Sequence, residues 1–152
     1  MKIYLVGPIS GESYGDVVAS IEERRSALLD QVDGVEIYHP MTGKGHLRTE
    51  TKFKSTGYAG SPVSSNRAIF GRDKWMVSQA DVIVADFSSA TIASIGSMFE
   101  LAWAHLQGKL VVVIMGEDNV HQHAFVLQAA DVIFEDFEEV VEYLQKIQEG
   151  SY

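Results

Sequence analysis

The sequence contains no cysteine and only three prolines in its 152 residues. Without thiols the chain cannot form disulfides, zinc–thiolate sites or a cysteine nucleophile, and this fits a reducing compartment, so we expect a cytoplasmic protein. No apolar run reaches the length of a membrane span, and the first residues lack a signal-peptide pattern. We therefore expect no membrane partner.

Basic residues are also scarce, because 12 Lys and Arg stand against 21 Asp and Glu, which gives a net charge of −9. A protein this acidic is poorly suited to bind duplex nucleic acid, because proteins bind duplexes mainly through the negatively charged phosphates. A bound phosphate would be held locally, by backbone amides, hydroxyls and one or two cationic side chains. Hydrophobic residues make up 46% of the chain, so a single domain with a sizeable core is expected over residues 1–152.

The most informative stretch leads up to Glu100. It opens with Val82–Ala85, a continuous apolar run of the kind found in strands buried on both faces. A turn of small polar residues follows, and a helix is predicted to begin near Gly96 or Ser97 and to stop at Gly108. Open α/β sheets bind ligands at the carboxyl ends of their strands, so we expect the functional site here.

Glu100 itself has two interpretations. With Ser97 it has the S-x-x-E spacing of a capping box, in which it would only satisfy the start of the helix. Alternatively it is a functional carboxylate, because the small residues before it leave backbone N–H groups open to a ligand. A second acid, Asp73, lies on the helix that precedes the same strand, although Arg72 and Asp73 are also typical of solvated surface charges. Spacing leaves both interpretations open.

Alternating strands and helices predict the fold. Apolar runs indicate strands at Lys2–Gly7, Val35–Tyr38, Val82–Ala85, Lys109–Met115 and Asp131–Phe134. Periodicity and capping signals indicate the other helices at Tyr14–Val32, Arg67–Gln79, Ala124–Ala130 and Phe137–Gln148, with Asn66 and Asp136 as N-caps of two of them. This order predicts an α/β fold, a flavodoxin-like doubly wound parallel sheet of five strands in the order 2-1-3-4-5 with helices on both faces.

Two irregular segments stand out. Gly7–Gly11 is a tight turn that suits either a sugar or phosphate cradle or a plain strand-to-helix turn. Residues 41–65 lack periodicity and form a long loop, either mobile and solvated or a lid over the site. The loop and its flank hold the basic part of an acidic protein, namely Lys44, His46, Arg48, Lys52, Lys54 and Arg67. A lid of this kind would carry positive charge toward an anionic ligand.

His121 and His123 form a His-x-His pattern in a polar turn. Such a pair is a metal signal only when a carboxylate or cysteine partner stands at a fixed spacing, and none does. We predict no metal site.

Four segments together resemble a known family. They are Lys2-Ile-Tyr-Leu-Val-Gly-Pro-Ile-Ser-Gly11, Arg72-Asp-Lys-Trp-Met76, Ala80-Asp-Val-Ile-Val-Ala-Asp86, and Gly96-Ser-Met-Phe-Glu-Leu101 followed by Gly108-Lys109. In this order and spacing they resemble the nucleoside 2-deoxyribosyltransferase superfamily, which includes the 2′-deoxynucleoside 5′-phosphate N-hydrolases. The resemblance covers most of the chain and implies the same flavodoxin-like fold.

The resemblance also implies an activity and a set of site residues. Glu100 matches the nucleophile that attacks C1′ of the sugar, and Asp73 matches the acid near the leaving base. The residues expected to bind substrate are Gly7, Pro8, Ile9, Ser10, Gly11, Asp86, Ser88, Ser94, Gly96 and Met98. No metal or organic cofactor is implied; the partners are a deoxynucleoside or deoxynucleotide and a free nucleobase. A homodimer or higher homo-oligomer is expected, with sites that borrow residues from a neighbour.

The acceptor is left open by two features. Transferases of the family carry an aspartate six residues before the nucleophile, where this chain has Ser94; the nucleotide hydrolases have a serine there, which contacts the 5′-phosphate. Ser10, Ser88 and Ser89 would complete such a phosphate pocket. The transferase activity is favoured by a second feature: the sequence ends at Tyr152, and some transferases use a terminal tyrosine in the site of a neighbouring subunit.

A third hypothesis is a nucleotide-binding module without catalysis, in which Glu100 only caps its helix.

Overall fold

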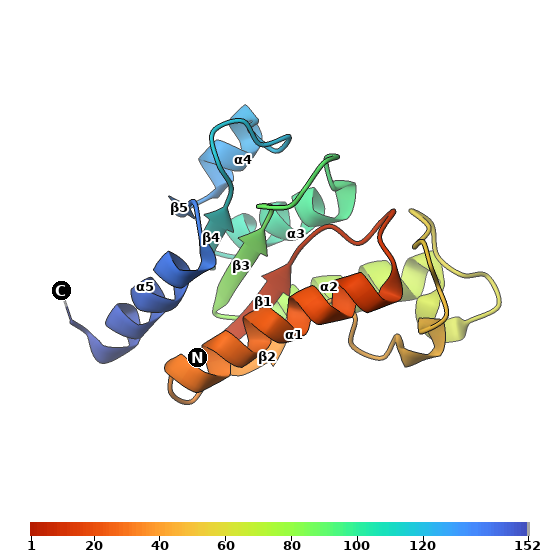
Figure 1. Ribbon diagram of the computed structural model, residues 1–152, viewed down its shortest axis with the longest axis horizontal. Coiled ribbons are helices and arrows are strands. Elements are labelled where there is room, and N and C mark those ends of the chain that lie inside the picture. The colour runs from red at the N-terminus through yellow and green to blue at the C-terminus, as the bar shows by residue number, and fades with distance from the viewer. Residues whose placement is uncertain (152) are drawn as a thin grey trace.

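The computed structural model describes residues 1–151; Tyr152, and with it the terminal-tyrosine hypothesis, lies outside the described residues. Five parallel strands form one sheet in the order β2-β1-β3-β4-β5 (Figure 1), which confirms the predicted flavodoxin-like α/β fold. The strands are β1 (Lys2–Val6), β2 (Glu36–Tyr38), β3 (Val82–Asp86), β4 (Leu110–Ile114) and β5 (Val132–Phe134). The helices are α1 (Tyr14–Gln31), α2 (Asn66–Gln79), α3 (Ile95–Leu106), α4 (Ala124–Ala129) and α5 (Phe137–Glu149).

The sheet separates two hydrophobic cores, because successive strand residues point to opposite faces. On one face, Tyr4 and Val6 of β1 pack with residues of α2 and α3, such as Met76 and Leu101. On the other face, strand residues such as Leu5 pack with α1 and α5. The alternation therefore directs the side chain of Tyr4 toward the helices that carry both predicted acids.

Two helix starts, those of α2 and α3, differ from the predictions. Ser94 is the N-cap of α3, and its hydroxyl accepts from the Ser97 N–H at 3.4 Å. Ser65, not Asn66, caps α2, because its backbone is extended and its hydroxyl reaches the N–H of Ala68. The predicted cap of α5, Asp136, is confirmed.

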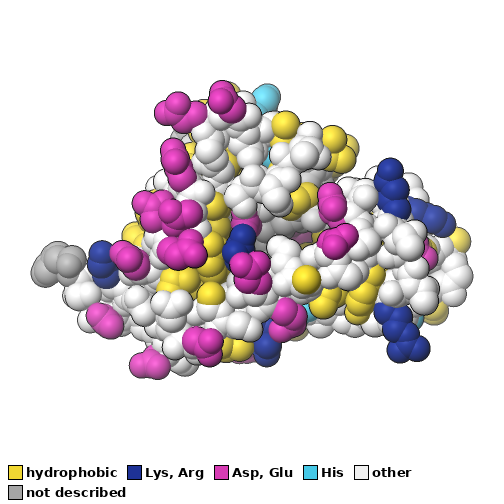
Figure 2. Space-filling model, viewed as in Figure 1, with side chains coloured by type: hydrophobic (Ala, Val, Ile, Leu, Met, Phe, Trp, Pro, Cys, Tyr) yellow, Lys and Arg dark blue, Asp and Glu magenta, His cyan; other side chains and the backbone are white. Residues whose placement is uncertain are grey.

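Residues 41–65 are packed against the body of the protein. They contain two 3₁₀ turns, η1 (Gly45–Leu47) and η2 (Pro62–Ser64). Met41, Leu47 and Phe53 are buried in a third cluster with Val17 of α1. Lys and Arg side chains gather at the end of the molecule that this segment forms (Figures 1 and 2).

Within residues 1–151, no helix has the length and apolar character that crossing a membrane requires.

Candidate active site

A cavity of about 550 Å³ opens beside the carboxyl end of β1. Its walls come from the loop after β1, from residues 41–65, and from α2 and α3. Both predicted acids, Glu100 and Asp73, line it. The structure therefore brings together two carboxyl groups that are far apart in the sequence, at the edge of the sheet where open α/β folds bind ligands.

Glu100 is held by a residue of the adjoining sheet. Its side chain is almost fully buried, at 7% exposure, and the Tyr4 hydroxyl donates to its Oε1 at 2.7 Å. Since Ser94 caps α3, Glu100 stands six residues after the cap, beyond the first turn in which a capping-box acid acts. The capping-box interpretation is therefore wrong, and the Glu100 side chain lines the cavity instead.

Burial raises the pKa of Glu100 to about 8. The nearby charge of Asp73 adds to this rise, while the Tyr4 hydrogen bond and the cations Lys44 and Arg72 oppose it. Burial likewise raises the pKa of Tyr4, so its hydroxyl keeps the proton that it donates. Ionisation of Glu100 is thus costly, and it depends on these four polar neighbours.

Asp73 is also buried, at 8% exposure, so its interpretation as a solvated surface charge is wrong. Arg72 donates from Nε to Asp73 Oδ1 at 3.1 Å, and a second guanidinium nitrogen lies 3.0 Å from the same oxygen. Burial raises the pKa of Asp73, against the opposing charges of Arg72 and Lys44. A carboxyl group with a raised pKa is suited to donate a proton near neutral pH.

Lys44 brings positive charge to the cavity from residues 41–65. Its side chain is 5% exposed and lines the cavity, and burial lowers its pKa while the charge of Asp73 opposes that shift. Among the described residues it has no ion-pair partner. The predicted basic segment therefore supplies a buried ammonium to the same cavity as Glu100 and Asp73.

Six of the ten residues predicted to bind substrate line this cavity: Gly7, Pro8, Ile9, Ser10, Ser94 and Gly96. Gly11 lies outside the lining, where its φ of +94° makes the turn into α1 and its N–H donates to Phe53 O. Met98 also lies outside and packs against the core. The loop after β1 and the start of α3 thus face each other across the cavity, as the flavodoxin-like order predicts.

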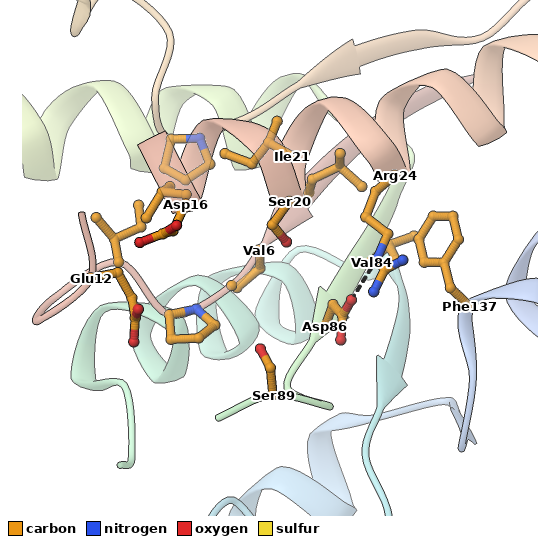
Figure 3. A pocket seen from close by; sticks show the side chains of 16 residues that line it. Val6, Glu12, Asp16, Ser20, Ile21, Arg24, Val84, Asp86, Ser89 and Phe137 are labelled. Atoms are coloured by element: carbon orange, nitrogen blue, oxygen red, sulfur yellow. Dashed lines mark hydrogen bonds and ion pairs between the residues drawn. The ribbon is translucent and has the colours of Figure 1, made fainter. Parts of the chain in front are cut away.

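Asp86 and Ser88, the other two, are also outside the lining of this cavity. Asp86 accepts from Arg24 Nε at 2.8 Å, and the guanidinium also lies over the Phe137 ring. This ion pair borders a second, smaller cavity of about 210 Å³ behind the loop after β1 (Figure 3). Ser88 is exposed and donates to Asp86, so both side chains are engaged in shaping the turn after β3.

Sequence reasoning missed Tyr4 and an aromatic wall. Phe70, Phe99 and Trp103 line the cavity and contact one another, with Phe70 and Trp103 edge to face at 4.9 Å between centroids. Phe70 and Phe99 remain about half exposed. A signal existed for Tyr4, since a hydroxyl in an otherwise apolar buried strand requires a partner. No comparable signal distinguished the aromatic residues from ordinary core positions.

Comparison with known proteins found no matching family model and no matching curated protein. Two solved structures are similar. One is the Clostridium botulinum CMP N-glycosidase BcmB, with a TM-score of 0.51, 16% identity, and coverage of 95% of this chain and 98% of that one. The other is a molybdenum cofactor binding protein from the phototrophic bacterium Rippkaea orientalis, with a TM-score of 0.57, 15% identity, and coverage of 97% and 96%. These similarities show the fold, which serves an N-glycosidase in one case and a cofactor-binding protein in the other.

We expect Tyr4→Phe to move the acid limb of the activity profile to higher pH. Because the Tyr4 hydrogen bond favours the Glu100 carboxylate, its loss raises a pKa that already stands at about 8. A hydrogen bond to a charged group contributes about 1.5–3 kcal/mol, which corresponds to about one to two pH units. The measurement is kcat/KM against pH. Tyr38→Phe, which removes a hydroxyl bonded to Glu36 on the surface, is the matched control; an unshifted limb in Tyr4→Phe would contradict the role.

Proposed function

We propose that this chain cleaves the N-glycosidic bond of 2′-deoxyribonucleosides and transfers the deoxyribosyl group, with Glu100 as the nucleophile. The observation that carries the proposal is the pair of buried carboxyl groups, Glu100 and Asp73, in one cavity. The resemblance of the sequence to the nucleoside 2-deoxyribosyltransferase superfamily supports the same assignment, as does the fold shared with an N-glycosidase.

Each step has a group to perform it. A Glu100 oxygen attacks C1′, the C1′–N bond breaks, and its electron pair leaves with the base, which takes a proton from Asp73. The transition state carries oxocarbenium character, which the carboxylate stabilises. An acceptor then attacks C1′ and displaces Glu100, and Asp73 accepts the proton that the acceptor loses.

The surrounding groups suit these roles. Tyr4 orients the attacking carboxylate, since its hydroxyl bonds to one of the two Glu100 oxygens. Lys44 and Arg72 favour the ionised form of Glu100, which must be a carboxylate to attack C1′, while burial keeps the pKa of Asp73 raised against their charges. The aromatic wall of Phe70, Phe99 and Trp103 offers apolar faces of the kind that stack on nucleobases.

A second candidate function is hydrolysis of 2′-deoxynucleoside 5′-monophosphates, with water as the acceptor. Ser94 favours it. The Ser94 oxygen accepts from Ser97 N–H and from the Ser97 hydroxyl, so the Ser94 hydroxyl proton is free to be donated into the cavity. The first turn of α3 adds backbone N–H groups and the positive end of the helix dipole. The similar structure of BcmB is that of an enzyme described as acting on a nucleoside monophosphate.

Product analysis tests the proposal. The protein is incubated with each deoxynucleoside and each 5′-monophosphate, with and without a free acceptor base, and the products are separated. A new nucleoside supports transfer, and free base released from monophosphates alone supports the second candidate. If no bond is cleaved in any mixture, the catalytic proposal is wrong, and the hypothesis of a non-catalytic nucleotide-binding module is favoured.

Ser94 variants separate the two candidates. If the substrate carries a phosphate, Ser94→Ala removes a hydrogen bond to a charged group, worth about 1.5–3 kcal/mol. We expect kcat/KM for monophosphates to fall roughly tenfold or more, with nucleosides nearly unchanged. Ser94→Asp places a negative charge next to the phosphate position and repels it. The ratio of kcat/KM values should therefore shift toward nucleosides. Equal losses on both substrates in Ser94→Ala would contradict phosphate recognition by this residue.

A further inference from the structure

His121 lies in the connection between β4 and α4 and is 1% exposed. Its ring stacks on Phe87, with centroids 4.0 Å apart and an interplanar angle of 14°. Ring atom Nε2 accepts from the backbone N–H of Ser94 at 2.9 Å. The histidine therefore touches the residue that follows β3 and the residue that caps α3, the two ends of the connection 87–94.

Asn119 completes the arrangement. Its side-chain nitrogen donates to Phe87 O at 2.7 Å, so its Oδ1 is the acceptor. That oxygen lies 2.9 Å from His121 N and 3.1 Å from ring atom Nδ1. We call these two residues, Asn119 and His121, the clamp.

The hydrogen bonds allow one protonation state of the ring. Since the Ser94 N–H can only donate, Nε2 of His121 must be unprotonated. The Nδ1 atom then carries the proton and donates to Asn119 Oδ1. Burial lowers the pKa of His121, in agreement with a neutral ring. The clamp thus depends on the Nδ1–H tautomer.

We propose that His121 is a positioning residue that fixes the connection 87–94 and the cap of α3 in the place that substrate binding requires. The inference rests on the proposed function, because Ser94 and Gly96 belong to the cavity wall. His121 does not line the cavity and acts through Ser94. Ser94 is in turn the cap whose hydroxyl and carbonyl hold the first turn of α3.

The clamp affects substrate binding more than the chemical step. Glu100 has its own anchor, because the Tyr4 hydroxyl holds it from β1 whatever happens at the start of α3. Loss of the clamp therefore displaces Ser94 and its neighbours while the attacking carboxylate stays in place. The expected signature is a higher KM with a smaller change in kcat.

Two substitutions separate the parts of the clamp. His121→Phe keeps the ring stacked on Phe87 but removes the acceptor for Ser94 N–H, and we expect KM to rise about tenfold with kcat changed less than threefold. His121→Gln keeps an acceptor near the position of Nε2 and should hold KM within about threefold of wild type. His123→Phe is the matched control: this exposed neighbour caps α4 and should leave both constants unchanged. A purely structural role predicts no rescue by Gln, or equal effects on kcat and KM, and either result overturns the proposal.

Two measurements do not depend on turnover. Imidazole ¹⁵N NMR at pH 7 should show His121 neutral with the proton on Nδ1, and the Nε2–H tautomer or an imidazolium would overturn the proposal. Calorimetry in the Glu100→Gln background is done with a deoxynucleoside and with its 5′-monophosphate, and the affinity for the ligand that binds should weaken about tenfold when His121→Phe is added; unchanged affinity would also overturn the proposal. A protein with the expected tautomer and binding loss that cleaves no substrate would refute the proposed function but leave the clamp standing.

Discussion

Glu100→Gln should abolish N-glycosidic cleavage, with a loss of at least about 10³-fold in kcat, because an amide cannot form the bond to C1′ that the carboxylate makes. Glu100→Ala should do the same. The amide keeps the volume of the buried side chain and an acceptor for the Tyr4 hydroxyl, so substrate binding should survive. The measurement is product formation under single-turnover conditions. Activity within tenfold of wild type in either variant would rule out the nucleophile role.

Stability supplies the control for this variant. The folded-state pKa of Glu100, about 8, lies above its ordinary value of 4.5. A raised pKa contributes stability that is fully present below the ordinary value and is lost as pH rises through the folded value. Wild type should therefore lose thermal stability as pH rises from about 4.5 to about 8, whereas Glu100→Gln should lose less. A variant that is inactive but stable at high pH separates a catalytic loss from unfolding.

The fold was predictable because its signals are local. Short apolar runs such as Val82–Ala85 and amphipathic stretches between them are enough to order the strands and helices, and the right-handed crossover rule supplies the sheet order. The starts of α2 and α3 were less predictable. For α2, Ser65 and Asn66 both suit an N-cap, and only the backbone angles decide between them.

The site was predictable only in part because its partners are distant in sequence. Glu100 and Asp73 could be identified from the resemblance, but the Tyr4 hydroxyl that orients Glu100 is 96 residues away. Lys44 belongs to a segment without periodicity, so its burial beside the acids follows from tertiary packing that no local pattern encodes. The clamp likewise joins Ser94 to a histidine 27 residues later.

These tertiary contacts also place two similar carboxyl groups in different surroundings. Glu100 accepts a hydrogen bond from a neutral hydroxyl, while Asp73 is paired with a guanidinium on its own helix. Both are buried, and the negative charge of Asp73 adds to the rise in the pKa of Glu100. The protons of the pair are therefore coupled, and kcat/KM should show a bell-shaped profile that belongs to the pair as a whole.

Asp73→Asn should lower the rate most for substrates with poor leaving bases. Asn keeps an oxygen that accepts from Arg72, so the fold and the cavity should persist, but it has no proton to donate to the departing base. Proton donation contributes about 10²–10⁴-fold when the leaving group needs it and much less when the leaving group departs easily. We therefore expect about 10²-fold or more loss on a natural deoxynucleoside and less than about tenfold on one with an activated leaving group.

The measurement compares kcat for the two substrates in wild type, in Asp73→Asn and in Asp118→Asn, which removes an exposed carboxylate outside the cavity. The control should leave both rates unchanged. A proton donor predicts a steeper dependence of rate on leaving-group pKa in the Asp73 variant, because the base must then depart as an anion. Equal losses on both substrates would instead assign Asp73 to substrate positioning, since a misplaced sugar slows departure of good and poor bases alike.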